Sequence, residues 1–131
     1  NMINRIIKRE ELTFDSKYYE DNAFQIIIID GHSIIDKTAF FREMELKFQF
    51  PGTCKNKFSR FDDWMTDLSW LPEHQGICIV INNYANFLSQ DPSFKRNVMN
   101  DFEENILPFW EEKVLKCVKD GKQRQFDIIL N

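Results

Sequence analysis

Three aspartates lie close together near the middle of the chain, at Asp62, Asp63 and Asp67. Carboxylates work in pairs as general acids and bases, or they bind cations and basic surfaces. Adjacent residues of a helix point about 100° apart, so Asp62 and Asp63 would not flank one substrate. Acids this close on a helix repel one another unless a partner or solvent surrounds them. The spacing therefore favours a binding surface or a solvated helix face over a catalytic pair.

A second kind of chemistry would use the thiol of Cys54 with a histidine base, either His32 or His74. No spacing in the sequence unites these residues, so a small enzyme is a lesser alternative and we assign no catalytic residue. Cys54, Cys78 and Cys117 are odd in number, far apart and without a CxxC spacing, which argues against a disulfide framework or a zinc site. We expect no metal and a reducing, cytoplasmic environment.

The distribution of charge favours a protein partner. The formal net charge is −4, and the segment 58–75 has one base against four acids. An acidic focus repels nucleic acid phosphates and attracts basic surfaces, so direct nucleic-acid binding is disfavoured. The turn Asp30-Gly31-His32-Ser33 has neither the GxGxxG nor the GxxxxGK[ST] spacing, so we expect no nucleotide and no other small-molecule cofactor.

Three short β-branched runs predict the framework that positions these residues. They span 23–29, 77–81 and 126–130, and each is nearly continuous rather than alternating, which is typical of buried strands in a parallel sheet. At least 40 residues separate consecutive runs, as parallel connections require. The 131 residues, 43% of them hydrophobic, are expected to form an α/β domain over 23–131 with the layout β-αα-β-αα-β, three parallel strands and about four helices.

The first crossover is predicted to hold two helices. Asp36 is a candidate N-cap for the first, which ends near 50–52. The second covers 58–70, with Asn56 as its cap and Pro72 as its stop. Its apolar residues fall within roughly 120° of arc, the width of a core-facing stripe. They are Phe58, Phe61, Trp64, Met65 and Leu68.

The second crossover is predicted to begin at the cap Asp91-Pro92 and to continue to Gly121, with Pro108 kinking the helix or starting a new one. Residues 1–22 form an N-terminal extension without a clear fold. Ile3, Ile6 and Ile7 could begin a helix there, and 12–14 could add an edge strand. Charges come too early for a signal peptide, and the apolar runs are too short for a membrane span.

The order of these elements and several motifs resemble the barstar family of ribonuclease inhibitors. Residues 29–31 stand where that family has a strand ending in an Asp-Gly turn, and Phe50-Pro51 stands where its first helix ends before the binding loop. The closest agreement is the segment 58–70, which ends in Asp67-Leu68-Ser69-Trp70. The resemblance covers about residues 24–131, with a divergent contact loop.

The resemblance implies a barstar-like fold and an intracellular inhibitor, such as the immunity protein of a bacterial toxin–antitoxin pair. Such a protein masks the basic active site of a ribonuclease or other toxin with helix carboxylates. Asp63 carries over as the central anionic contact. The other expected contacts are Asp62, Ser59, Thr53, Lys55, Lys57 and Trp70. Because Ser59 replaces an Asp of the family and two lysines lie in the contact loop, a different toxin or a non-inhibitory interaction module stays open.

Overall fold

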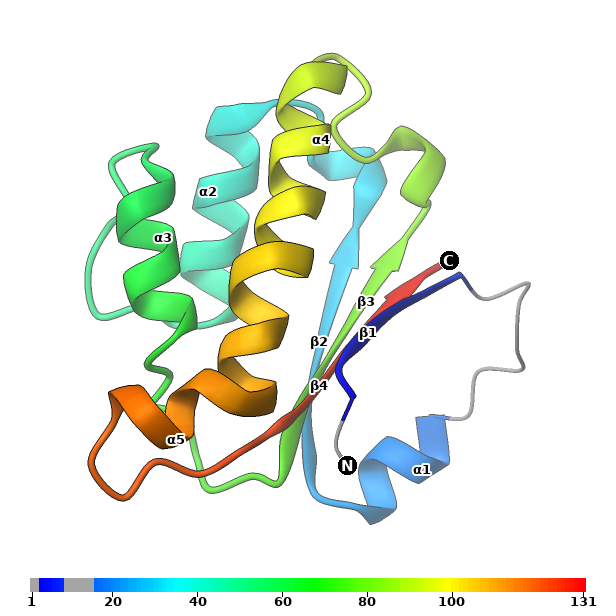
Figure 1. Ribbon diagram of the computed structural model, residues 1–131. Coiled ribbons are helices and arrows are strands. Elements are labelled where there is room, and N and C mark those ends of the chain that lie inside the picture. Colours follow the sequence, from blue (N-terminus) through cyan, green and yellow to red (C-terminus); the bar gives the residue numbers. More distant parts are fainter. Residues whose placement is uncertain (1–2, 9–15) are drawn as a thin grey trace.

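The computed structural model describes residues 3–8 and 16–131, and it contains a parallel sheet with helices on both faces (Figure 1). The strands run in the order β1-β4-β3-β2, and every adjacent pair is parallel. They are β1 (Arg5–Lys8), β2 (Phe24–Asp30), β3 (Gly76–Asn82) and β4 (Gln125–Leu130). The α/β class and the three predicted strands are therefore confirmed.

The prediction of a three-stranded sheet is wrong, because β1 adds a fourth strand. Ile6 and Ile7 lie opposite Ile128 and Ile129 of β4, in a strand rather than in a helix. A run of two isoleucines between charged residues does not reveal its own secondary structure. Here β4 determines the conformation, because its outer edge has unpaired backbone N–H and C=O groups with which β1 can pair. The predicted strand at 12–14 lies outside the described residues.

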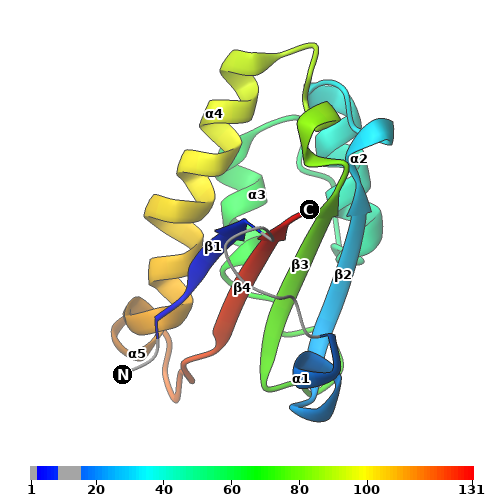
Figure 2. The same ribbon diagram turned by 90° about the vertical axis from the view of Figure 1, so that its right-hand side faces the viewer.

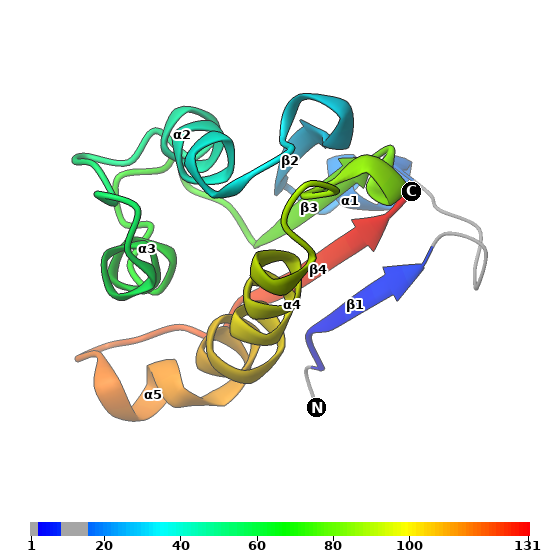
Figure 3. The same ribbon diagram turned by 90° about the horizontal axis from the view of Figure 1, so that it is seen from above.

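The helices form two layers of unequal size (Figures 2 and 3). One face of the sheet is covered by α2 (Lys37–Lys47), α3 (Phe58–Met65) and α4 (Pro92–Asp101), and α1 (Ser16–Asp21) covers the other face. After α4 the helical run continues through η4 (Phe102–Ile106), η5 (Phe109–Lys113) and α5 (Val114–Cys117). Both η segments are π-helical. Pro108 lies between them in helical conformation, so it belongs to this run and does not start a separate helix.

Two of the predicted N-caps are confirmed, and the third is wrong. The Asp36 carboxylate accepts from the Ala39 N–H, and the Asp91 carboxylate accepts from the Phe94 N–H, each at 3.0 Å. Asn56, in contrast, has a left-handed backbone with φ of 54°. The N-cap of α3 is therefore the next residue, which carries no side-chain cap.

The helix α3 is also shorter than predicted, because it ends at Met65 rather than near Pro72. Leu68 has a φ of 55°, and its N–H donates to the Trp64 carbonyl at 3.2 Å. The motif Asp67-Leu68-Ser69-Trp70 thus forms the exit from the helix. A left-handed, buried leucine is not visible in a hydrophobic pattern, and this explains the error.

The main core lies between the sheet and the larger helical layer. Phe61 of α3 is fully buried, and its ring centroid lies 5.4 Å from that of Phe40 in α2 and 6.0 Å from that of Phe102 in η4. A smaller cluster under α1 contains Tyr19 and Ile129. The described part of residues 1–22 therefore adds the strand β1 to the sheet and packs the helix α1 on one of its faces. Among the described residues, no helix combines the length and the apolar character needed to cross a membrane.

Candidate functional site

Asp63 lies on the exposed face of α3, and the opposite face of this helix packs against the core. Phe61 and Met65 on the opposite face are fully buried. Asp63 is exposed, and no described residue forms a hydrogen bond or an ion pair with its carboxylate. It lines a surface hollow of about 320 Å³ together with Arg60, Trp64 and Asp67.

Aromatic packing fixes this surface. The Trp64 ring stacks on Phe50 at 6.2 Å and meets the Trp70 ring edge-on at 5.6 Å between centroids. The indole N–H of Trp70 donates to the Phe48 carbonyl at 2.8 Å. Trp70, an expected partner contact, is half-buried and ties the α3 exit to the end of α2. Aromatic pairs at such distances add stability beyond the area that they bury, so the floor of the hollow is well defined.

The contact loop before α3 turns its basic residues outward. Thr53, Lys55 and Lys57 are exposed, whereas Cys54 between them is fully buried. The backbone N–H of Cys54 donates to the Glu45 carboxylate at 2.7 Å and fixes the loop to α2. With Ser59 and Arg60 also exposed, this surface is basic at the start of α3 and acidic toward its end.

Asp62 is placed differently from its neighbour. It is half-buried, and its carboxyl contacts that of Asp101 at the end of α4. Burial, followed by the hydrogen bond and the negative charge of Asp101, raises the pKa of Asp62 to about 8. The structure thus brings Asp63 together with Asp67 and Arg60, and it turns Asp62 toward a second helix. Asp101 was not predicted from the sequence, because no spacing links it to α3.

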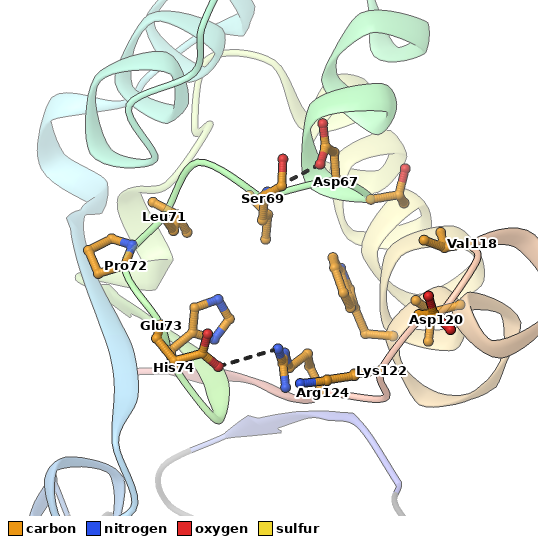
Figure 4. Close-up of a pocket in the computed structure, with 15 residues that line it drawn as sticks. Asp67, Ser69, Leu71, Pro72, Glu73, His74, Val118, Asp120, Lys122 and Arg124 are labelled. Carbon is orange, nitrogen blue, oxygen red and sulfur yellow. Dashed lines mark hydrogen bonds and ion pairs between the residues drawn. The ribbon is translucent and has the colours of Figure 1, made fainter.

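A larger cavity of about 520 Å³ lies between the α3 exit and the segment after α5 (Figure 4). Asp67 lines both this cavity and the hollow at Asp63. Arg124 reaches Glu73 at 3.8 Å across one wall. Beside them, burial and then the Arg124 charge lower the pKa of His74, which keeps the imidazole neutral. The apolar part of the lining consists of Leu68, Leu71, Pro72, Trp110, Val114 and Val118.

Cys54 does not have the environment of a nucleophile. It is fully buried, and burial, followed by the nearby Glu45 carboxylate, raises the pKa of its thiol to about 12. The charged groups that act on this thiol are Glu45 and Arg60, and neither is an imidazole base. A thiol in this setting is protonated at neutral pH. Within residues 3–8 and 16–131, no group of three or more His, Cys, Asp or Glu side chains is arranged to hold a metal ion.

Comparison with protein families identifies a match over residues 24–120 to the family described as barstar, the barnase inhibitor. This range includes α2, the loop 51–57, α3 and the whole helical run through α5. Its description is that of an inhibitor that binds a ribonuclease, not of an enzyme. A search of curated proteins finds no match. Since the family match covers most of the chain, this protein belongs to the barstar family.

Proposed function

We propose that this chain is an inhibitor, or immunity protein, that binds a basic ribonuclease or other toxin through the surface around Asp63. The observation that carries this proposal is the exposed Asp63 carboxylate, which no described residue pairs, on a helix whose core residues Phe61 and Met65 are fully buried. Membership of a family of ribonuclease inhibitors supports the same assignment.

The physical argument rests on what a nuclease must present. An active site that holds phosphates is basic, so a carboxylate on a fixed helix both steers the encounter and pairs with a cation once bound. Because α3 is braced by Phe61 and Met65, little side-chain or backbone order has to be created on binding.

The polarity of the surface indicates which partner fits. Lys55 and Lys57 lie at one end of the proposed contact surface, and Asp63 and Asp67 lie at the other, next to Arg60. A partner that is basic throughout would be repelled by the lysines. We therefore propose a target with a basic pocket for Asp63 and an acidic or neutral rim facing the loop 51–57. A non-inhibitory interaction module on the same fold would use this surface without blocking an active site.

The direct test is binding and inhibition with barnase, the ribonuclease that the family description specifies, and with a panel of other basic ribonucleases. Affinity for an inhibited enzyme should fall by about 30-fold to 1,000-fold in Asp63→Ala, as expected when one side of a buried charge pair is removed. Association should also slow as salt rises. The control is Asp21→Ala, an exposed carboxylate on α1, on the opposite face of the sheet.

The outcomes separate the alternatives. An Asp63→Ala affinity within a few-fold of the unmodified protein would show that another surface makes the contact. Binding of a ribonuclease without loss of its activity would favour the interaction module over the inhibitor.

A further inference from the structure

Two carboxyl groups from different helices meet at the boundary between α3 and the long helical run. Asp62 belongs to α3, and Asp101 is the last residue of α4, where it is 8% exposed. The carboxyl groups of these two residues contact each other. Buried acids are uncommon unless a cation or a set of donors compensates them.

The donors around this pair are too few for two ionised groups. Asp101 Oδ1 accepts a hydrogen bond from the Asn105 side-chain amide at 2.8 Å. Asp101 Oδ2 and Asp62 Oδ1 are both shielded from solvent, and no described residue donates to either. The charged groups that act on Asp62 are Asp101 across the boundary and Asp63 on its own helix, and both are acids. The Thr66 hydroxyl donates to the Asp62 backbone carbonyl and not to its carboxylate.

An ionised carboxylate can only accept hydrogen bonds, whereas a protonated one also has a donor. We propose that Asp62 and Asp101 share one proton at neutral pH, and that this proton holds α3 against α4 and thereby positions the surface that carries Asp63. A hydrogen bond between a carboxyl and a carboxylate is charge-assisted, and therefore stronger than a neutral one. Asp101 thus acts as a positioning residue, because it reaches the binding surface only through Asp62.

The proton makes stability depend on pH in a defined direction. Asp62 has an ordinary pKa of 3.8, and burial raises it to about 8 in the folded protein. Between these values the native state holds a proton that the unfolded chain has lost. The equilibrium constant for unfolding therefore increases as pH rises, by up to about tenfold per pH unit from this pair. Above pH 8 both states have lost the proton, and the contribution becomes constant.

The test is urea unfolding of the unmodified chain and of Asp62→Asn at several pH values from 5 to 9. The amide introduced by Asp62→Asn donates to Asp101 without titrating. The ratio of the two unfolding constants, unmodified chain over variant, should therefore rise with pH and level off above pH 8. The control is Glu104→Gln, which removes an exposed carboxylate from the same helical run. The ratio of unfolding constants, unmodified chain over Glu104→Gln, should stay constant with pH.

A direct measurement covers the case in which Asp62→Asn does not fold. Carbon-13 NMR of the side-chain carboxyls in the unmodified protein should show one aspartate that titrates far above the ordinary range. The proposal of a shared proton would be overturned if the ratio of the two unfolding constants stayed the same from pH 5 to pH 9. It would also be overturned if every aspartate titrated below pH 6 in the NMR spectrum. Neither measurement needs a partner, so failure here is distinct from failure of the proposed function. If the proposed function holds, partner binding should also weaken above pH 8, because α3 then loses the shared proton that positions its surface.

Discussion

The three cysteines differ in ways that predict their reactivity. Cys54 and Cys78 are fully buried, and burial is the main cause that raises the pKa of each thiol to about 12, whereas Cys117 is exposed. Since the thiolate is the reactive form, a thiol reagent such as dithionitrobenzoate should modify one cysteine quickly in the native protein at pH 8. Cys117→Ser should remove that fast phase, and denaturant should release the other two thiols. Rapid modification of Cys54 would mean that the loop 51–57 opens in the native state.

At the scale of single residues, the sequence predicts which side chains are exposed better than it predicts which side chains contact each other. Helical spacing is enough to place Asp63 and Asp67 on the exposed side of the segment, and both are exposed in the structure. It is not enough for Asp62, whose environment is set by Asp101 on another helix. Likewise, the sequence gives no indication that the buried Cys54 of an otherwise exposed loop faces Glu45. Burial and charge at such positions depend on tertiary contacts that no local pattern encodes.

At the scale of elements, α3 lacks one ordinary stabilising contact at its start. Lys57 has the extended backbone of an N-cap, with φ of −122° and ψ of 131°, but it makes no side-chain cap. Lys57→Ser should accept a hydrogen bond from the first turn and increase the free energy of unfolding by about 0.5–1 kcal/mol. Chemical denaturation would measure the gain. Lys55→Ser is the control, since Lys55 lies in the turn before the helix with a φ of 50°. An equal gain in both variants would point to loss of lysine charge instead.

The elements that the sequence predicts well are those with strong periodic patterns. The apolar stripe predicted for the segment 58–70 is confirmed, because Phe61, Met65 and Leu68 are buried and the remaining two members pack against the core. The helix starts at Phe58 as predicted, but its C-terminal end was not predictable, because it depends on the left-handed backbone of Leu68. The strand β1 was not predicted, for a different reason. It has four residues, and only its pairing with β4 distinguishes it from a helix start.

At the scale of the whole molecule, β1 completes the sheet by pairing with β4, which follows the region that matches the family. The match begins at residue 24, so β1 and α1 precede the matched region. Without β1, the outer edge of β4 would be open to pairing with another chain. Covering that edge with β1 and binding a partner through α3 are compatible, because α4 lies between β1 and α3 (Figure 3). We therefore expect the first strand to affect association and stability rather than partner choice.

Asn4 provides the polar contacts that hold β1 in place. Its side-chain amide donates to the carbonyls of Leu107 and Arg124 at 3.2 and 3.0 Å, and its side-chain oxygen accepts from the Phe126 N–H at 2.9 Å. Asn4→Ala would leave these backbone groups unsatisfied in a site where Asn4 itself is 8% exposed. The free energy of unfolding should fall by about 2–4 kcal/mol, measured by urea denaturation.

The matched control is Gln123→Ala, because Gln123 also donates a side-chain amide to a carbonyl of the long helical run, that of Glu111, but from an exposed position. Gln123→Ala should lower the free energy of unfolding by less than about 0.5 kcal/mol, since water can replace the lost hydrogen bond. Similar costs for the two variants would mean that β1 adds no more stability than a surface contact. A large cost for Asn4→Ala alone, with unchanged ribonuclease binding, would show that the N-terminal strand completes the sheet while the α3 surface works independently of it.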